Sequence, residues 1–200
     1  MGKTTKILLI VFGAFFFMML MLVFWFVGVY NSLQEMDEDV AGKWAQVENV
    51  YQRRSDLIPN LVNTVKGYAD FEKETLTGVI EARSKATAIN IDPSNLSPAA
   101  ISQFQKAQDG LSSALSRLLV TIERYPDLKA NQNFLQLQSQ LEGTENRIAI
   151  ERMRFNEAVQ ALNAKIRKIP ASLIAPMAGV ERKGYFEAEE GSEKAPEVKF

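Results

Sequence analysis

The sequence contains no cysteine and no histidine. Without cysteine the chain forms no disulfide and offers no thiolate nucleophile. Without histidine it lacks the side chain that most often acts as a general base or binds zinc and iron. Lysine and arginine number 23 against 24 aspartate and glutamate residues, so there is no basic excess for binding a nucleic-acid backbone. These absences argue against nucleic-acid binding and predict no cofactor.

One long apolar run stands apart from this mixed composition. Every residue in the range Ile7–Val29 is apolar or glycine, and a helix of that length spans about 35 Å, enough to cross a bilayer. A secretory signal peptide is the alternative, because Lys3 and Lys6 give a charged start. The run is about twice the length of a signal peptide's apolar core, and no small-residue cleavage site follows it. We therefore predict a stub at 1–6 and an uncleaved membrane helix at 7–30.

The charges beside this segment predict its orientation. Lys3 and Lys6 precede it, whereas the first cation after it is Lys43. Because cations accumulate at the cytoplasmic end of a membrane helix, the amino terminus is expected in the cytoplasm and the large domain outside it. Trp25 and Tyr30 lie where aromatic side chains hold a helix at the membrane interface. Together with Lys3 and Lys6 they are the candidate membrane-interface anchors.

Beyond the apolar run, large apolar residues recur every three or four positions, which is typical of helices with one buried face. The first stripe comprises Leu33, Met36, Val40, Trp44, Val47 and Tyr51. It continues backwards through Phe26, so the membrane helix is expected to run straight into the first soluble helix and to fix the domain's orientation to the bilayer. A second helix is expected to start at Asp56, with Pro59 in its first turn, and to carry a stripe from Ile58 through Tyr68 to Ala86.

Two further helices follow a loop at 90–95. Ser97 and Pro98 are predicted to be the cap and first residue of the third helix, and the fourth runs from Asn131 to Ile169. The third stripe comprises Ile101, Phe104, Leu111, Leu115, Leu118 and Ile122. Four long helices with short connections favour an antiparallel bundle.

The predicted fold class is therefore all-α, a membrane helix followed by a long antiparallel four-helix bundle at 31–186. Within that domain, the segment Leu173–Met177 is too broken by proline to predict a helix. The last residues, 187–200, are charged and poor in large apolar side chains, so a disordered tail is expected there.

Several ordered motifs resemble the LemA family of bacterial membrane proteins. They are Tyr30-Asn31, Arg53-Arg54-Ser55-Asp56-Leu57-Ile58-Pro59-Asn60-Leu61-Val62, Val65-Lys66-Gly67-Tyr68, Tyr125-Pro126-Asp127-Leu128-Lys129-Ala130-Asn131, Thr144-Glu145-Asn146-Arg147-Ile148-Ala149, Arg154-Phe155-Asn156, Pro170, Gly179 and Tyr185-Phe186-Glu187. The resemblance implies a single-pass bacterial membrane protein with a helical-bundle domain, which the flanking charges place in the cytoplasmic (inner) membrane. The family has no agreed biochemical activity, and a relative associated with magnetosome membrane formation suggests membrane organisation by analogy only. The resemblance supplies no catalytic residues.

The polar clusters of the soluble part predict an ion-pair network rather than a catalytic site. Glu145 lies beside the apolar seam of the fourth helix, and a buried carboxylate there needs a cation, from the Arg53-Arg54 pair or from Arg152. The candidate structural polar network comprises Arg53, Arg54, Asp56, Glu145, Arg147 and Arg152. The metal alternative uses Glu142 with Glu145, but two carboxylates on one helix make a weak site. No catalytic, cofactor-binding or metal-ligating residue is predicted.

We therefore expect a membrane-anchored, non-enzymatic helical scaffold or interaction protein of the bacterial envelope. Its expected partners are the lipid bilayer and either further copies of itself or another membrane or envelope protein, with no nucleic acid and no small-molecule substrate. The main alternative is a sensor or adaptor for a membrane-bound protease or an envelope-stress pathway. A carboxylate-based metal-binding enzyme is the third hypothesis. The carboxyl end at Val198–Phe200 also fits a groove that binds terminal carboxylates.

Overall fold

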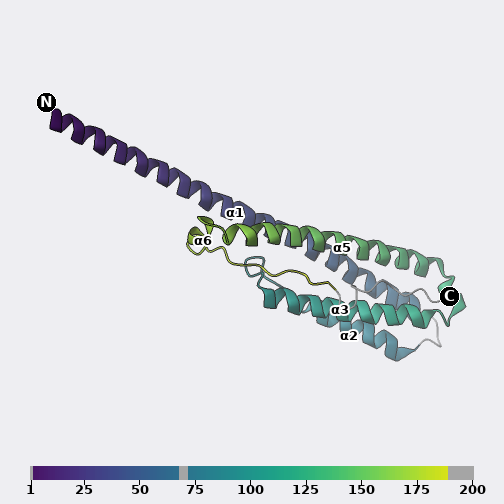
Figure 1. Cartoon of the computed structure of the whole chain (residues 1–200). Coiled ribbons are helices and arrows are strands. Elements are labelled where there is room, and N and C mark those ends of the chain that lie inside the picture. Colours follow the sequence, from purple (N-terminus) through teal and green to yellow (C-terminus); the bar gives the residue numbers. More distant parts are fainter. Residues whose placement is uncertain (1, 68–71, 189–200) are drawn as a thin grey trace, which may run out of the picture. The chain divides into compact units, whose positions relative to one another are not determined.

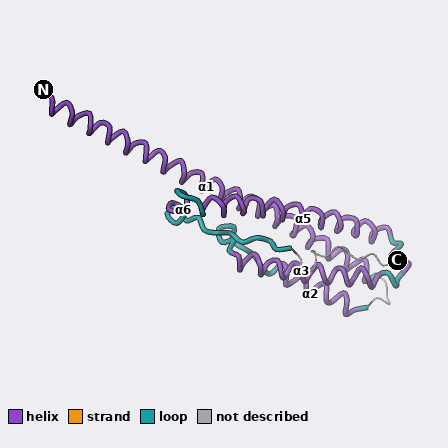
Figure 2. The backbone as a smooth tube through the Cα atoms, in the orientation of Figure 1, coloured by secondary structure: helices purple, strands orange, loops and turns teal. Residues whose placement is uncertain are grey.

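The structure is a computed structural model that describes residues 2–67 and 72–188 of the chain. Every regular element in these two ranges is a helix (Figures 1 and 2). In chain order the helices are α1 (Lys3–Lys66), α2 (Lys73–Thr87), α3 (Pro98–Ile122), α4 (Pro126–Lys129), α5 (Gln132–Ile166) and α6 (Ala171–Ile174). The prediction of an all-α chain with a long apolar helix at its start is thus confirmed for the described residues.

The chain divides into two compact units. The first unit comprises Met1–Val40 and Gln160–Arg182, and the second comprises Ala41–Val159 and Lys183–Phe200. Helices α1 and α5 each contribute residues to both units. The two units are described separately below.

From Ile7 to Trp25, α1 is apolar on all sides. Each described residue before Phe26 is exposed, including large side chains such as Phe24, whose surface is 75% exposed. Within the described residues, α1 is the one helix long and apolar enough to cross a membrane. A helix that is apolar all round and buries none of this surface in protein fits a membrane location.

Helix α1 continues through Pro59, where the sequence predicted a new helix starting at Asp56. That prediction is wrong: the helix ends only at Lys66, before Gly67. A proline has no N–H, so the carbonyl of Ser55, four residues earlier, loses its usual helical partner. Arg83 of α2 replaces it, because its Nε donates to the Ser55 oxygen at 2.9 Å. This contact lets the proline stay inside the helix without an unsatisfied carbonyl.

The core of the second unit collects side chains from four long helices. One cluster of buried apolar residues draws on α1, α2, α3 and α5, with Leu128 added from α4, and α2 and α3 pack along one another. Its members are Ile58, Leu61, Val62, Val65, Leu76, Val79, Ala86, Leu111, Ala114, Leu115, Leu118, Ile122, Leu128, Phe134 and Leu141. This cluster contains most of the second and third stripes that the sequence predicted.

The loop and the cap before α3 are as predicted. Residues 90–95 lie outside any helix, and the Asp92 carboxylate accepts hydrogen bonds from the Ser94 N–H and hydroxyl at 2.9 and 2.8 Å. Ser97 caps α3, since its hydroxyl accepts a hydrogen bond from the Ala100 N–H at 3.3 Å, and Pro98 is the first helical residue.

Two predictions near the end of the chain are wrong. Helix α5 ends at Ile166 rather than at Ile169, and the Ile169 side chain is 83% exposed instead of continuing the buried stripe. The segment Leu173–Met177 was predicted to hold no helix, but the one-turn helix α6 includes its first two residues. Ala171 and Ile174 are buried, and their burial stabilises this helical turn. The prolines on either side, Pro170 and Pro176, limit its length.

Three sequence predictions fall wholly or partly outside the described residues. Tyr68, at the end of the second stripe, lies there, as does the carboxyl end at Val198–Phe200. Of the predicted tail at 187–200, only Glu187 and Ala188 are described.

Candidate functional site

Arg54 is the most deeply buried charge of the second unit. It lies on the same face of α1 as Tyr51 and Ile58, at a spacing of three and four residues, and only 2% of its surface is exposed. Its Nη1 donates to the Ser112 hydroxyl at 2.8 Å and to Glu145 Oε2 at 3.0 Å. Its Nη2 donates to the side-chain and main-chain oxygens of Gln108, at 2.7 and 3.3 Å.

The counter-charge of Arg54 is much less buried than Arg54 itself. The Glu145 side chain is 55% exposed, so its carboxylate remains hydrated while it faces the guanidinium. The neutral oxygens of Ser112 and Gln108 supply the other acceptors, and the guanidinium also lies 5.0 Å from the centre of the Tyr51 ring. A guanidinium keeps its proton in proteins, so this arrangement fixes the packing of three helices and offers no proton transfer.

The other residues of the predicted polar network lie elsewhere. Arg53 and Arg147 are exposed, and Asp56 is exposed and accepts a hydrogen bond from Gln52 of the preceding turn at 2.8 Å. Arg152 lies apart from Glu145, with its guanidinium 4.7 Å from the Phe186 ring and its Nη2 donating to the Glu187 carbonyl at 3.0 Å. Of the six predicted residues, the structure therefore brings together Arg54 and Glu145.

The predicted membrane-interface anchors lie on the first part of α1. Lys3 is the first residue of the helix, and both it and Lys6 are exposed. Trp25 is 52% exposed, whereas Tyr30 is half-buried and stacks on Phe26 with ring centres 6.5 Å apart. Burial along α1 thus begins at the point where the sequence predicted the end of the membrane helix.

A segment for which the sequence predicted no packing contact covers the core of the second unit. We call residues 183–188 the strap. Two side-chain amides each hold one strap residue by both its main-chain groups: Asn156 of α5 binds Phe186 with two hydrogen bonds of 2.9 Å, and Gln105 of α3 binds Glu187 with two of 3.0 Å. Such pairs imitate the neighbouring strand of a sheet, so they hold an extended backbone in place.

Phe186 completes an aromatic cluster beneath the strap. Its ring stacks on Trp44 at 6.1 Å between centres, and it meets Phe155 and Phe104 edge-on at 5.5 and 6.4 Å. The rings of Trp44 and Tyr51 each meet the Phe104 ring edge-on, with 5.1 Å between ring centres in both pairs. The prediction that Trp44 and Tyr51 are core residues is confirmed, since 0% and 5% of their surfaces are exposed.

Close packing of the strap requires glycine at position 184. The Gly184 N–H donates to the Leu96 carbonyl at 2.8 Å. A Cβ atom added at Gly184 would lie 2.6 Å from the Cα of Pro98 and 3.1 Å from the Ser97 oxygen. Any side chain here forces the strap away from the start of α3.

Helical periodicity in the sequence did not predict the buried amides or the strap. The polar residues at two expected core positions were nevertheless visible in the sequence. The third stripe jumps from Phe104 to Leu111, and Gln108 fills the missing position. The first and second stripes leave a similar gap between Tyr51 and Ile58, which Arg54 fills. A polar residue at an expected core position predicts a buried polar partner on a facing helix. Phe186 lies in no helix, so helical periodicity carries no signal for it.

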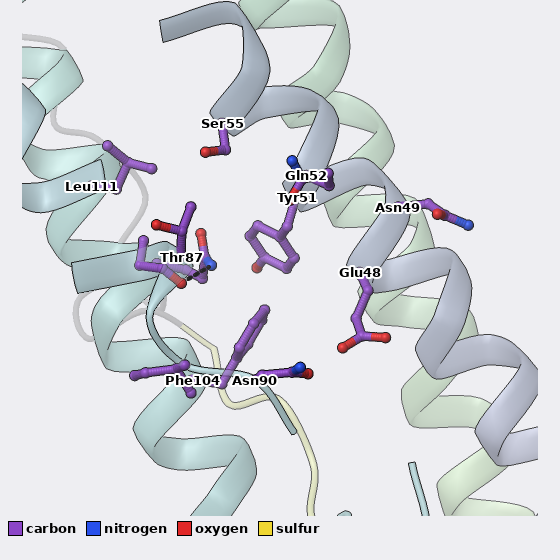
Figure 3. Close-up of a pocket in the computed structure, with 12 residues that line it drawn as sticks. Glu48, Asn49, Tyr51, Gln52, Ser55, Thr87, Asn90, Phe104 and Leu111 are labelled. Carbon is purple, nitrogen blue, oxygen red and sulfur yellow. Dashed lines mark hydrogen bonds between the residues drawn. The ribbon is translucent and has the colours of Figure 1, made fainter. Parts of the chain in front are cut away.

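A pocket of about 320 Å³ opens beside this polar centre (Figure 3). The figure shows the rings of Tyr51 and Phe104 close together, with Glu48 beside them. Partial burial raises the pKa of the Glu48 carboxyl above its ordinary value, and the Trp44 indole opposes that rise. Burial likewise raises the pKa of the Tyr51 hydroxyl, against the opposing pull of Arg152 and Arg54. One carboxylate among amides and hydroxyls does not make a metal centre.

The described residues contain no cluster of three or more acidic side chains that suits a metal ion. The pair Glu142 and Glu145 illustrates this. Glu142 accepts a hydrogen bond from Gln138 at 3.0 Å, while Glu145 faces Arg54. The two carboxylates are therefore engaged with different partners.

Comparisons with known proteins find relatives of the chain. The MamQ magnetosome protein of Magnetospirillum gryphiswaldense is 27% identical over 176 residues, which cover 78% of this chain and 64% of that protein. The MamQ 1 magnetosome protein of Paramagnetospirillum magneticum is 26% identical over 177 residues, covering 79% and 64%. The LemA protein of Metamycoplasma hominis is 28% identical over 177 residues, covering 88% and 77%.

The chain therefore spans less than two thirds of the length of the MamQ proteins that it matches. The family model of LemA matches residues 43–200, which include α1 from Lys43 onwards, all later helices and the strap. This match confirms the resemblance drawn from the sequence motifs: the chain belongs to the LemA family.

Proposed function

We propose that the protein is a membrane-anchored, non-enzymatic helical scaffold of the bacterial envelope that binds further copies of itself or another envelope protein. One observation carries this proposal: a single helix, α1, begins as an exposed apolar segment and continues as a main contributor to the core of the second unit. An apolar segment of that length is costly in water and stable in a bilayer.

The proposal includes an antiparallel four-helix bundle made of the later part of α1 with α2, α3 and α5. Support comes from the core cluster, which takes side chains from all four helices. The connections between consecutive long helices are short, at 67–72, 88–97 and 123–131, and such connections favour antiparallel neighbours. Arg54 adds a specific register, because its partners lie at fixed positions on α3 and α5.

A scaffold role is also supported by the chemistry of the buried polar groups. Arg54 is held by Ser112, Gln108 and Glu145, so this buried cation is committed to partners within the protein. The amides of Gln105 and Asn156 are likewise engaged with the strap. Buried polar groups committed to each other stabilise one packing arrangement.

The relatives suggest where such a scaffold acts. The MamQ relatives are named as magnetosome proteins. On that ground we extend the proposal to membrane organisation. The flanking lysines Lys3 and Lys6 support an amino terminus in the cytoplasm and a domain on the other side of the cytoplasmic membrane.

Crosslinking of the full chain in native membranes, followed by mass spectrometry, tests the proposal. Crosslinks between identical peptides, together with oligomers in light scattering of the detergent-solubilised chain, are the result expected of a self-assembling scaffold. A stoichiometric crosslink to a membrane protease would instead favour the adaptor hypothesis. Monomers with no crosslinked protein partner would contradict the scaffold role.

A further inference from the structure

Three large apolar side chains project from the turn that follows α5. Ile169, Leu173 and Met177 are 83%, 71% and 71% exposed. They lie on the turns before and after the one-turn helix α6 and within it: the Ser172 N–H donates to the Lys168 oxygen at 2.9 Å, and the Ala178 N–H to the Ile174 oxygen at 3.0 Å. We call these three exposed apolar residues the 169–177 face.

The opposite face of the same turn is packed in the first unit. Ala171, Ile174 and Ala175 are each less than 5% exposed. This internal packing holds the turn in place, so the outward position of Leu173 between Ile174 and Ser172 is set by the fold. An exposed apolar face on a well-packed element marks an interaction surface.

A hydrogen bond places this turn near the end of the apolar segment of α1. Gln34 Nε2 donates to the Ala178 carbonyl at 2.8 Å. Gln34 follows Tyr30 by four residues, which is about 6 Å along a helix axis. Figure 1 shows α6 beside α1 in this region. Ala178, which directly follows Met177 of the face, thus lies about one helical turn from the level where the apolar segment ends.

The charges around the face fit a lipid headgroup layer. Arg167 and Lys168 precede Ile169 and are exposed. Long cationic side chains reach lipid phosphates while apolar neighbours enter the layer beneath. The acidic residues of α1 begin at Glu35, and their charges keep that stretch of helix in water. The expected contact is therefore shallow.

We propose that the 169–177 face, with Arg167 and Lys168, is a second contact with the bilayer that α1 crosses. Ile169, Leu173 and Met177 enter the headgroup region, and the two cations bind lipid phosphates. Continuity with the apolar segment and the adjoining cations favour lipid over a protein partner. The proposal rests on the membrane anchoring under the proposed function, and it assigns to the first unit a second contact with the membrane surface.

Depth-dependent quenching of single fluorescent labels tests this contact. Because the chain has no cysteine, the full-length variants Leu20→Cys, Leu173→Cys and Glu38→Cys each carry one label. They are reconstituted into phosphatidylcholine vesicles, with or without phosphatidylglycerol, that contain lipids spin-labelled near the headgroup. Glu38 is the matched control in the same unit, since it is exposed and lies about 12 Å beyond Tyr30 along α1.

We expect the label at position 173 to lose fluorescence to the spin-labelled lipid and the label at position 38 to keep it. The loss should grow with phosphatidylglycerol and shrink in the double variant Arg167→Gln with Lys168→Gln. Equal quenching in that double variant would overturn the role given to the two cations.

Position 20 separates this inference from the anchoring on which it rests. In a second set of vesicles the lipids carry the spin label deep in the acyl chain, which should quench the label at position 20. If position 20 is quenched there and position 173 is not quenched by the headgroup label, the second contact alone is overturned. No quenching at either position would overturn the anchoring as well. A blue-shifted but unquenched label at position 173 would show that protein, and not lipid, covers the face.

Discussion

The two parts of α1 differ in how far they bury their large apolar side chains. Before Phe26 the helix exposes phenylalanine, leucine and tryptophan on all sides, whereas from Leu33 onwards it buries such residues on one face and presents charges on the other. Both parts form the same regular helix. The comparison teaches that secondary structure alone does not reveal the surroundings of a helix; the distribution of apolar residues around its axis does.

The two tryptophans of the chain give the largest expected contrast between these parts. Trp44 is fully buried among aromatic rings, so Trp44→Ala should lower the free energy of unfolding by about 3–5 kcal/mol. Trp25 is 52% exposed, and Trp25→Ala should change it by less than about 0.5 kcal/mol. Denaturant unfolding of the full chain in detergent, followed by circular dichroism, measures both. Similar losses in the two variants would remove the distinction between the two parts.

The neighbouring arginines Arg53 and Arg54 compare a buried and an exposed charge within the later part of α1. Arg54→Ala leaves the oxygens of Gln108 and Ser112 without their donor, while the exposed Glu145 carboxylate stays hydrated, so the expected cost is about 1–3 kcal/mol. Arg53→Ala, at an exposed position, should cost less than about 0.5 kcal/mol. The same unfolding measurement applies. If both variants unfold like the wild type, the buried guanidinium of Arg54 does not support the core.

Two glycines make a further contrast. Gly184→Ala places a methyl group 2.6 Å from the Pro98 Cα and should cost about 1–3 kcal/mol, because backbone and not a flexible side chain must move. Gly42→Ala meets no atom within 4 Å and should raise stability by up to about 1 kcal/mol, since alanine favours the helix. Thermal melting of the two variants should shift in opposite directions. A Gly184→Ala variant as stable as the wild type would show that the strap is not closely packed.

The smallest expected effect is the pH dependence of Glu48. Burial raises its pKa in the folded protein, so folding favours the protonated carboxyl and the ionised form opposes folding. The stability due to protonated Glu48 is therefore present below its ordinary pKa and lost as the pH rises through the folded-state pKa. Glu48→Gln should raise the melting temperature slightly at neutral pH, and this gain should vanish in acid. A gain that persists at low pH would rule out titration of Glu48 as its cause.

Helix content and core stripes could be predicted from the sequence because periodic burial leaves a periodic pattern. Trp44 and Ile58 follow that pattern and are buried as expected. The break between the first two helices was misplaced, because proline usually starts a helix and the sequence does not show that Arg83 takes up the freed Ser55 carbonyl. That compensation arises from tertiary contact and has no local signal.

The polar centre shows the same limit. Arg53 and Arg54 are identical in type and adjacent, and only the phase of the stripe, through Tyr51 and Ile58, separates the buried one from the exposed one. The strap was harder to predict. Phe186 reaches the core through amide contacts from Gln105 and Asn156, which lie far away in the sequence.

The central claim, that one helix serves a bilayer along its first part and a protein core along its second, can be tested by cysteine scanning. Single cysteines placed one at a time along residues 7–50 of the full chain in membranes are labelled with a water-soluble maleimide. The account predicts protection at every position of the apolar segment, then protection that recurs every three or four residues beyond Leu33. Labelling throughout residues 7–29, or a mature chain that lacks them, would contradict it.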